Sequence, residues 1–280
     1  MAFTLKFLGT GTSVGVPQIG CTCPVCTSAD PRDRRQRTGA YVSDGVTGFL
    51  IDTPPEMRLA CIAYGITNVA AVVLTHAHMD HIAAFDDVRR FNTLNGARVA
   101  CDPNAPGANG RDWRIIGRPM PCYASEETAA QMHHIFPYIG TNPGENGLFR
   151  PQIYFDAAPC FTIGTVTLER FSVEHGFPCC GYLLTAANGC RLGYASDCHD
   201  LPDEALARLR GVDVMVLDCL REREHPTHLS LPRAKEYLSR IAPKRAYLVH
   251  MCHDLTHVEW LTKLAGTNIE PAFDGLEINL

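Results

Sequence analysis

The chain contains the run Thr75-His76-Ala77-His78-Met79-Asp80-His81, which places three imidazoles and one carboxylate within six residues. In an extended backbone, residues two positions apart point to the same side, so His76 and His78 can bind one metal ion. A turn after this pair would direct Asp80 and His81 toward a second ion. Imidazole and carboxylate ligands suit zinc, manganese or iron, and such ions lower the pKa of a bound water molecule. The run therefore predicts a metal centre.

The apolar run Ala70–Leu74 before this motif predicts a buried strand, so the predicted ligands follow a strand end. Other strands are expected at Thr4–Leu8, Ala40–Ser43, Gly48–Asp52, Thr165–Arg170, Gly181–Leu184, Arg191–Ala195, Val212–Leu217, Ala246–Val249 and Leu276–Leu280. Helices are expected at Pro55–Tyr64, from Ser125 toward Phe136, at Pro202–Leu209, at Leu231–Ile241 and from Leu255. Residues Cys101–Gly117, rich in Gly, Pro and Asn, predict an irregular insertion. This order fits two packed sheets with helices outside, one form of α/β fold.

Length and charge narrow the class of protein. A chain of 280 residues with 46% hydrophobic residues can bury the core of one large α/β domain or two smaller ones. A net charge of −5 argues against broad nucleic-acid binding through a basic surface, although a small nucleotide in a local pocket remains compatible with it. The sequence holds no run of eighteen apolar residues and no apolar signal segment, so we expect a cytoplasmic protein without a membrane span.

Thirteen cysteines are an odd number, so a complete set of disulfides is impossible. In a reducing compartment, metal ligation or simple burial explains such residues better. The run Cys21-Thr22-Cys23-Pro24-Val25-Cys26 offers three thiolates within six residues, a pattern typical of tetrahedral zinc with one further ligand from elsewhere. His250 and His253 are three residues apart, so one of them can serve each of two metal sites.

The run His-x-His-x-Asp-His at residues 76–81 resembles the hallmark motif of the metallo-β-lactamase superfamily, and the resemblance extends along most of the chain. It implies a four-layer αββα sandwich, formed by a single domain over residues 1–280 with a cysteine-rich zinc loop at about 20–27. It also implies two catalytic metal ions, with Asp197 bridging them. One ion would be bound by His76, His78, His175 and Asp197, and the other by Asp80, His81, His250 and Asp197.

The cysteine loop, which follows Gly9-Thr10-Gly11-Thr12, resembles that of the branch holding the cyclic-ribose phosphodiesterase of the carbon–phosphorus lyase pathway. That resemblance assigns the structural zinc to Cys21, Cys23, Cys26 and His253. It assigns the general acid to His228, although His225 lies close enough in sequence to compete for the role. Asp80 would also help to position the nucleophile.

The basic run Arg34, Arg35 and Arg37 follows the cysteine loop. Two interpretations stay open at this point. The run can be a solvated face, or it can steer a phosphate toward the metal ions.

The resemblance implies a phosphodiesterase that acts on a small phosphate ester, cyclic esters included. Two zinc or manganese ions about 3.5–4 Å apart can share a hydroxide nucleophile, and a third, structural zinc would lie at the cysteines. Alternatives are a ribonuclease Z, although no Gly- and Lys-rich arm is visible, a thioester or lactam hydrolase, and a binding or carrier protein resembling pyrroloquinoline-quinone biosynthesis protein B. Neither a large nucleic acid nor a membrane is expected as a partner, and a homodimer is compatible with the sequence. The substrate and the identity of the metals stay open.

Overall fold

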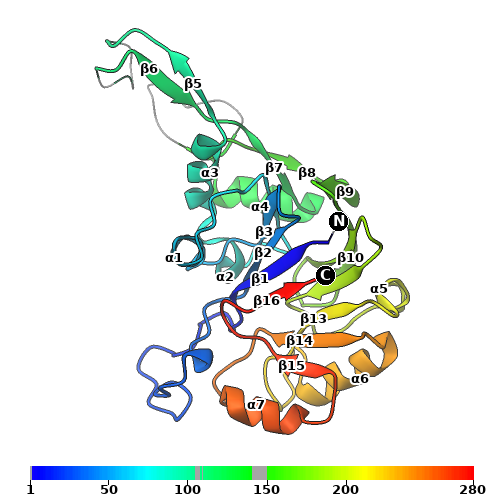
Figure 1. The fold of residues 1–280 in the computed structure, drawn as a ribbon. Helices are drawn as coiled ribbons and strands as arrows, with labels where there is room; N and C mark the ends of the chain where they lie inside the picture. Colours follow the sequence, from blue (N-terminus) through cyan, green and yellow to red (C-terminus); the bar gives the residue numbers. More distant parts are fainter. Residues whose placement is uncertain (1, 105–107, 109, 141–149) are drawn as a thin grey trace.

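The computed structural model describes residues 2–104, 108, 110–140 and 150–280. Two seven-stranded sheets pack face to face (Figure 1). The first sheet is antiparallel from β16 to β3 and parallel from β3 to β8. Its strand order is β16 (Glu277–Asn279), β1 (Thr4–Gly9), β2 (Gly39–Ser43), β3 (Gly48–Ile51), β4 (Ala71–Val73), β7 (Met120–Tyr123) and β8 (Ile153–Asp156).

The second sheet is parallel from β15 to β12 and antiparallel from β12 to β9. Its order is β15 (Ile269–Pro271), β14 (Arg245–Val249), β13 (Val214–Asp218), β12 (Arg191–Ala195), β11 (Cys179–Ala186), β10 (Val166–Val173) and β9 (Cys160–Ile163). The parallel strands of both sheets end in loops that carry the predicted ligands, which is where such sheets commonly bind ligands.

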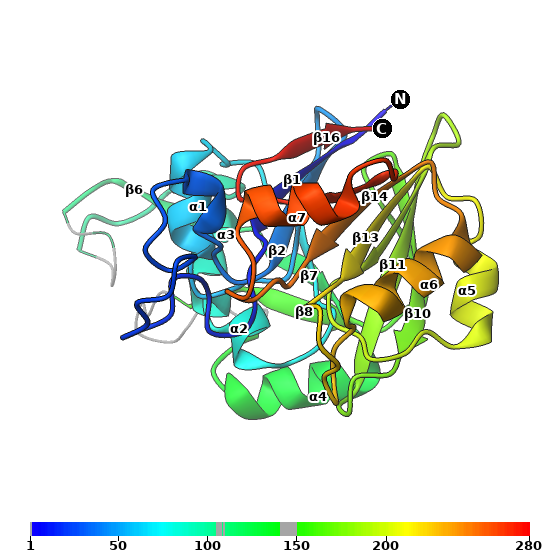
Figure 2. The same ribbon diagram turned by 90° about the horizontal axis from the view of Figure 1, so that it is seen from below.

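Helices cover the outer face of each sheet, as Figure 2 shows for the second one. The first sheet packs against α1 (Met57–Ala63), α2 (Met79–Ile82), α3 (Arg89–Leu94) and α4 (Glu126–Ile135), with short 3₁₀ turns at Pro31–Asp33 and Phe85–Val88. The second sheet packs against α5 (Asp203–Leu209), α6 (Leu231–Ile241) and α7 (His257–Leu264). A separate apolar layer, including Phe7, Phe49, Tyr182 and Tyr194, fills the space between the sheets. The predicted four-layer αββα fold is therefore confirmed.

One expectation was wrong in part. The region Cys101–Gly117 is not wholly irregular, because β6 (Trp113–Ile116) pairs with β5 (Ala97–Ala100) as an antiparallel hairpin that projects from the body of the molecule (Figure 1). The Gly and Pro signals belong to the connection between these strands, where residues 105–107 and 109 lie outside the described part. The guanidinium of Arg98 lies 3.9 Å from the centre of the Trp113 ring, a cation–π contact that ties the two strands together.

No helix within the described residues combines the length and the apolar character that crossing a lipid bilayer requires.

Asp274 joins three segments that are distant in sequence. It lies before β16, its Oδ1 accepts a hydrogen bond from the Thr10 hydroxyl at 2.8 Å, and its Oδ2 accepts one from the Gln36 amide at 2.7 Å. Although part of the residue is exposed, desolvation of the carboxyl raises the pKa of Asp274 to about 7. The folded chain therefore holds this proton more tightly than the unfolded chain, whose aspartates titrate near pH 4.

Such a shift makes the folded state lose stability as the pH rises from about 4 to about 7. We expect Asp274→Asn, which keeps the shape of the side chain, to gain stability relative to the parent protein between pH 6 and pH 8. Urea unfolding of both proteins at the two pH values measures this difference. Parallel pH profiles would show that Asp274 is ionised in the folded state.

Candidate active site

Three of the predicted ligands meet at the first group of donors. His76 and His78 lie in the loop between β4 and α2, and His175 follows β10. The Nδ1 atom of His78 is 2.9 Å from Nε2 of His76 and 3.3 Å from Nε2 of His175. Two nitrogens bound to the same ion at about 2.0–2.1 Å are separated by about 2.9–3.4 Å, so these three atoms can share one ion.

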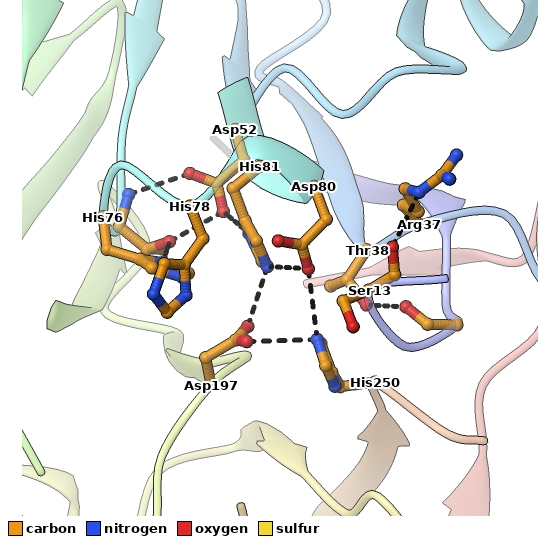
Figure 3. Close-up of polar contacts among 12 residues, drawn as sticks. Ser13, Arg37, Thr38, Asp52, His76, His78, Asp80, His81, Asp197 and His250 are labelled. Carbon is orange, nitrogen blue, oxygen red and sulfur yellow. Dashed lines mark hydrogen bonds and ion pairs between the residues drawn. The ribbon is translucent and has the colours of Figure 1, made fainter. Parts of the chain in front are cut away.

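The remaining predicted ligands form the second group, shown in Figure 3. Nε2 of His81 lies 3.4 Å from Oδ2 of Asp80 and 3.1 Å from Oδ1 of Asp197. Nε2 of His250 lies 3.6 Å from the same Asp80 oxygen and 3.1 Å from Oδ2 of Asp197. That Asp197 oxygen is also 3.9 Å from Nε2 of His175. Asp197 therefore lies between the two groups, where a bridging carboxylate would have to lie.

Buried atoms without a hydrogen bond test whether the residues fit metal ions. Within the described structure, Nε2 of His81, Nε2 of His250 and Oδ1 of Asp197 are buried and have no hydrogen-bond partner. Buried polar atoms of this kind demand a partner, and a bound ion is one. Nitrogen and carboxylate donors at these separations fit divalent cations.

The protonation states of the donors also favour metal binding. Burial lowers the pKa of His175 to about 4, and it lowers the pKa values of His76 and His78 as well. Burial opposes ionisation of Asp80, but the nearby imidazoles of His250 and His81 hold the pKa of its carboxyl below the usual value. The three imidazoles are therefore neutral at pH 7 and the carboxylate is charged, as metal ligation requires.

Two supporting contacts orient the donors. Nδ1 of His81 is 2.8 Å from Oδ2 of Asp52, a fully buried carboxylate that also accepts hydrogen bonds from the amide and hydroxyl of Thr75, each at 2.8 Å. Nδ1 of His175 donates to the carbonyl of Thr227 at 2.8 Å. Such contacts fix which ring nitrogen faces the ion. Sequence analysis did not identify Asp52, although its place directly after the apolar strand β3 was a signal.

His228 has a carboxylate partner that sequence analysis also missed. Nδ1 of His228 is 2.7 Å from Oδ2 of Asp218, the buried last residue of β13, and that oxygen also accepts a hydrogen bond from the Cys198 amide at 2.9 Å. The His228 ring lies 4.4 Å from the His250 ring, measured between ring centres. His225, the competing candidate, accepts hydrogen bonds from the Thr227 amide and hydroxyl through Nδ1 and lies 5.3 Å from the His228 ring.

The four predicted ligands of the structural zinc lie together. Nδ1 of His253 is 3.3 Å from Sγ of Cys21 and 3.4 Å from Sγ of both Cys23 and Cys26. Tetrahedral zinc with ordinary Zn–S and Zn–N bond lengths separates such atoms by about 3.6 Å. A hydrogen bond from the Cys26 amide lowers the pKa of the Cys23 thiol to about 6, which favours the thiolate. The residues therefore fit one zinc ion.

The basic run divides between two roles. Arg35 is fully buried and donates to the carbonyls of Cys252 and Leu255, so it belongs neither to a solvated face nor to a phosphate-steering surface. Arg37 pairs with Glu56 and donates to the Ser13 carbonyl at 2.8 Å, on the Asp80 side of the donor groups (Figure 3). Of Arg35 and Arg37, only Arg37 lies near the donor groups.

Removing the carboxylate behind His81 tests the supporting contacts. We expect Asp52→Asn to weaken binding of the ion at the second group about 10- to 100-fold, because the amide lacks the carboxylate charge and cannot accept from both the Thr75 amide and His81 Nδ1. Zinc affinity measured by competition with a chelator reports the change, with Asp156→Asn as the control, because the Asp156 carboxylate accepts a hydrogen bond from the Ala158 amide and not from a metal-donor residue. Unchanged affinity in Asp52→Asn would contradict the assigned role.

Comparisons with known proteins agree with this geometry. Residues 44–251 match the family model described as a Beta-lactamase superfamily domain. The chain is 33% identical to a crystal structure described as a new diphosphatase from the PhnP family, with a TM-score of 0.82 and coverage of 100% of this chain and 98% of that one. The zinc-bound PqqB of Methylobacterium extorquens shares the fold at 19% identity and a TM-score of 0.73, over 99% of this chain and all of that one.

Two curated relatives carry other names. The octanoyltransferase of Porphyromonas gingivalis is 30% identical over 277 residues, which are 96% of this chain but 50% of that protein, so the chain spans half the length of that relative. Coenzyme PQQ synthesis protein B of a Methylobacterium species is 29% identical over 234 residues, covering 75% of this chain and 71% of that one. The family match and the αββα fold, with its clustered His and Asp donors, show that the chain belongs to the metallo-β-lactamase superfamily, in its PhnP-like branch.

Proposed function

We propose that the protein is a dinuclear metal-dependent phosphodiesterase that acts on a small phosphate diester, cyclic diesters included. The observation that carries the proposal is the His228–Asp218 pair beside a complete set of seven donors. A ring nitrogen of His228 lies within 4.8 Å of donor atoms of both His175 and Asp197. The pair therefore supplies a protonatable group beside the place where two metal ions would bind.

Each group of donors has its own task in this reaction. His76, His78 and His175 with Asp197 would hold one ion, and Asp80, His81 and His250 with Asp197 the other. Bound there, two zinc or manganese ions would supply a water-derived nucleophile at neutral pH and stabilise charge on the phosphoryl oxygens. Asp80 contacts His81 and His250 through Oδ2, so we assign its Oδ1 the task of orienting the attacking water.

Departure of the alcohol defines the task of His228. An alkoxide is a strong base, so the breaking P–O bond needs a proton at its oxygen. Asp218 accepts a hydrogen bond from Nδ1–H of His228, so in the imidazolium form Nε2 carries the second proton, which it delivers to the alkoxide and thereby leaves the ring neutral. A diphosphate, the kind of substrate that the name diphosphatase implies for the structural relative, departs as a far less basic phosphate. The His228–Asp218 pair therefore favours an ester over a diphosphate as the substrate.

The other relatives suggest competing functions. Coenzyme PQQ synthesis protein B supports a binding or carrier role, and octanoyltransferase supports an acyl substrate. The fold similarity to the short form of human tRNase Z, at 13% identity and a TM-score of 0.63, leaves RNA cleavage as a third candidate. The projecting hairpin of β5 and β6 carries Arg98 and Arg114, whereas the sequence had suggested no protruding arm. The net charge of −5 still favours a small substrate.

Metal counting combined with substrate screening separates these functions. We expect about three metal ions per chain, two at the catalytic donors and one at the cysteines. We also expect cleavage of bis(p-nitrophenyl) phosphate and of a 2′,3′-cyclic nucleotide after loading with zinc or manganese. A diphosphate, a thioester, a lactam and a precursor tRNA serve as the competing substrates. A single zinc and no cleavage under any metal would favour the carrier role instead.

The leaving group tests the general acid. For an alkyl phosphodiester, His228→Ala should lower kcat about 10²- to 10⁴-fold, because the alkoxide must leave unprotonated. For a p-nitrophenyl diester the loss should be small, since p-nitrophenolate is stable without a proton. His225→Ala is the matched control and should behave like the parent protein with both esters. Equal losses in His228→Ala for both leaving groups would contradict the role of His228, and a selective loss in His225→Ala would transfer that role to His225.

A further inference from the structure

The segment 250–255, called here the ligand loop, carries one donor for each kind of metal site. His250 belongs to the catalytic donors, and His253 belongs to the cysteine cluster. The backbone between them is held by its neighbours: the Met251 amide donates to Thr10 O at 3.0 Å, and the Cys252 amide donates to Leu220 O at 2.9 Å. The two residues are therefore joined by a short backbone segment with little freedom, and a change in the position of His253 also changes the position of His250.

Arg35 grips the same loop from inside the protein. Nη1 of this fully buried residue donates to the Cys252 carbonyl at 2.5 Å, and Nη2 donates to the Leu255 carbonyl at 2.9 Å. Its charge is paired with Asp33 at 3.5 Å, and Asp33 in turn accepts a hydrogen bond from the amide of His257, the first residue of α7. A buried guanidinium with these partners is restrained, because each lost hydrogen bond would leave a buried donor without a partner.

The backbone of Arg35 connects these side-chain contacts with the cysteine loop. Its amide and carbonyl both pair with Val16, each at 2.8 Å, just before the cysteines in the chain. The backbone also passes so close to Gly11 that a Cβ atom at Gly11 would lie 2.6 Å from the Arg35 carbonyl oxygen. Both ribbon views place the cysteine loop beside the start of α7 (Figures 1 and 2). Arg35 and the cysteine cluster therefore hold the ligand loop from one continuous segment.

His250 has a conformation that needs such restraint. Its φ of 59° lies in the left-handed region, which residues with a side chain rarely adopt unless their surroundings impose it. The ring nonetheless points Nε2 toward Asp80 and Asp197 (Figure 3). The donors His76, His78 and His175 come from other loops, after β4 and β10, and have no direct contact of this kind with Arg35 among the described residues.

We propose that Arg35 is a positioning residue that couples the cysteine cluster to the catalytic donors by clamping the ligand loop. The inference rests on the metal sites of the proposed function, but not on its substrate. Zinc at the cysteines raises the affinity of the second catalytic group, which contains His250. By linkage, an ion in that group raises the affinity of the cysteines by the same factor. The first group, built around His76, His78 and His175, responds less.

Cobalt(II) titration of the metal-free full chain tests the coupling without any substrate. Thiolate-to-cobalt absorption reports the cysteine cluster, and the weaker visible bands report the imidazole and carboxylate groups. We expect Arg35→Met to weaken binding at the second catalytic group about 10- to 100-fold, with a change of only a few fold at the first. Arg35→Lys, which keeps the charge but not the forked donors, should restore part of the affinity.

Arg170→Met is the matched control, because Arg170 likewise bridges two backbone carbonyls, those of Ala124 and Ala157, away from the ligand loop. It should leave both catalytic affinities unchanged. Cys23→Ser should weaken the second group as Arg35→Met does, and the double variant should lose less than the sum of the two.

Parent-like binding at both groups in Arg35→Met and Cys23→Ser would overturn the coupling. Equal weakening of both groups would also overturn it, because that result indicates general destabilisation. If the parent protein shows coupled binding but cleaves no phosphodiester, the proposed function fails while the coupling stands.

Discussion

Three carboxylates are buried where the two sheets meet, and much of the rest of the site follows from that. Asp52, Asp197 and Asp218 are each almost inaccessible to solvent, and each contacts an imidazole, from His81, His250 and His228 respectively. Burying like charges side by side is unfavourable unless cations or hydrogen-bond donors compensate. The imidazole contacts supply part of the compensation, and the two divalent ions of the proposed function would complete the charge balance.

The same constraint explains the placement of the loops. Each of these carboxylates is the last residue of a strand with a parallel neighbour, β3, β12 or β13, or lies one or two residues after it, so the strand register sets its depth. The histidines come from loops after the strands and, for His81, from the short helix α2. Function in such a fold is therefore carried by the residues at the strand ends and not by the sheets themselves.

Much of this architecture could be predicted from sequence, for physical reasons that differ by element. Leu231–Ile241 was predicted with both ends correct, because apolar residues recur at helical spacing after Ser230 with a proline in the first turn. The strand Arg191–Ala195 was also correct. Strands β7 and β8 were missed, and Pro121 within β7 argues against an interior strand. Asp52 and Asp218 were missed because a place at a strand end does not reveal which histidine, 29 or 10 residues away, the carboxylate will meet. The hairpin was missed because exposed Arg and Ile residues on β6 hide the alternation of a half-buried strand.

The close approach of Gly11 to Arg35 has a consequence for how variation in this chain should be interpreted. Any side chain at position 11 would collide with main-chain atoms, which cannot move aside as a flexible side chain can. A screen of random substitutions for activity would therefore recover glycine at this position almost as strictly as histidine at position 76. The two positions would look alike in such data, although one would be retained for its donor atom and the other for the absence of a Cβ. A residue that never varies close to Arg35 is thus not shown by that fact to contact the substrate.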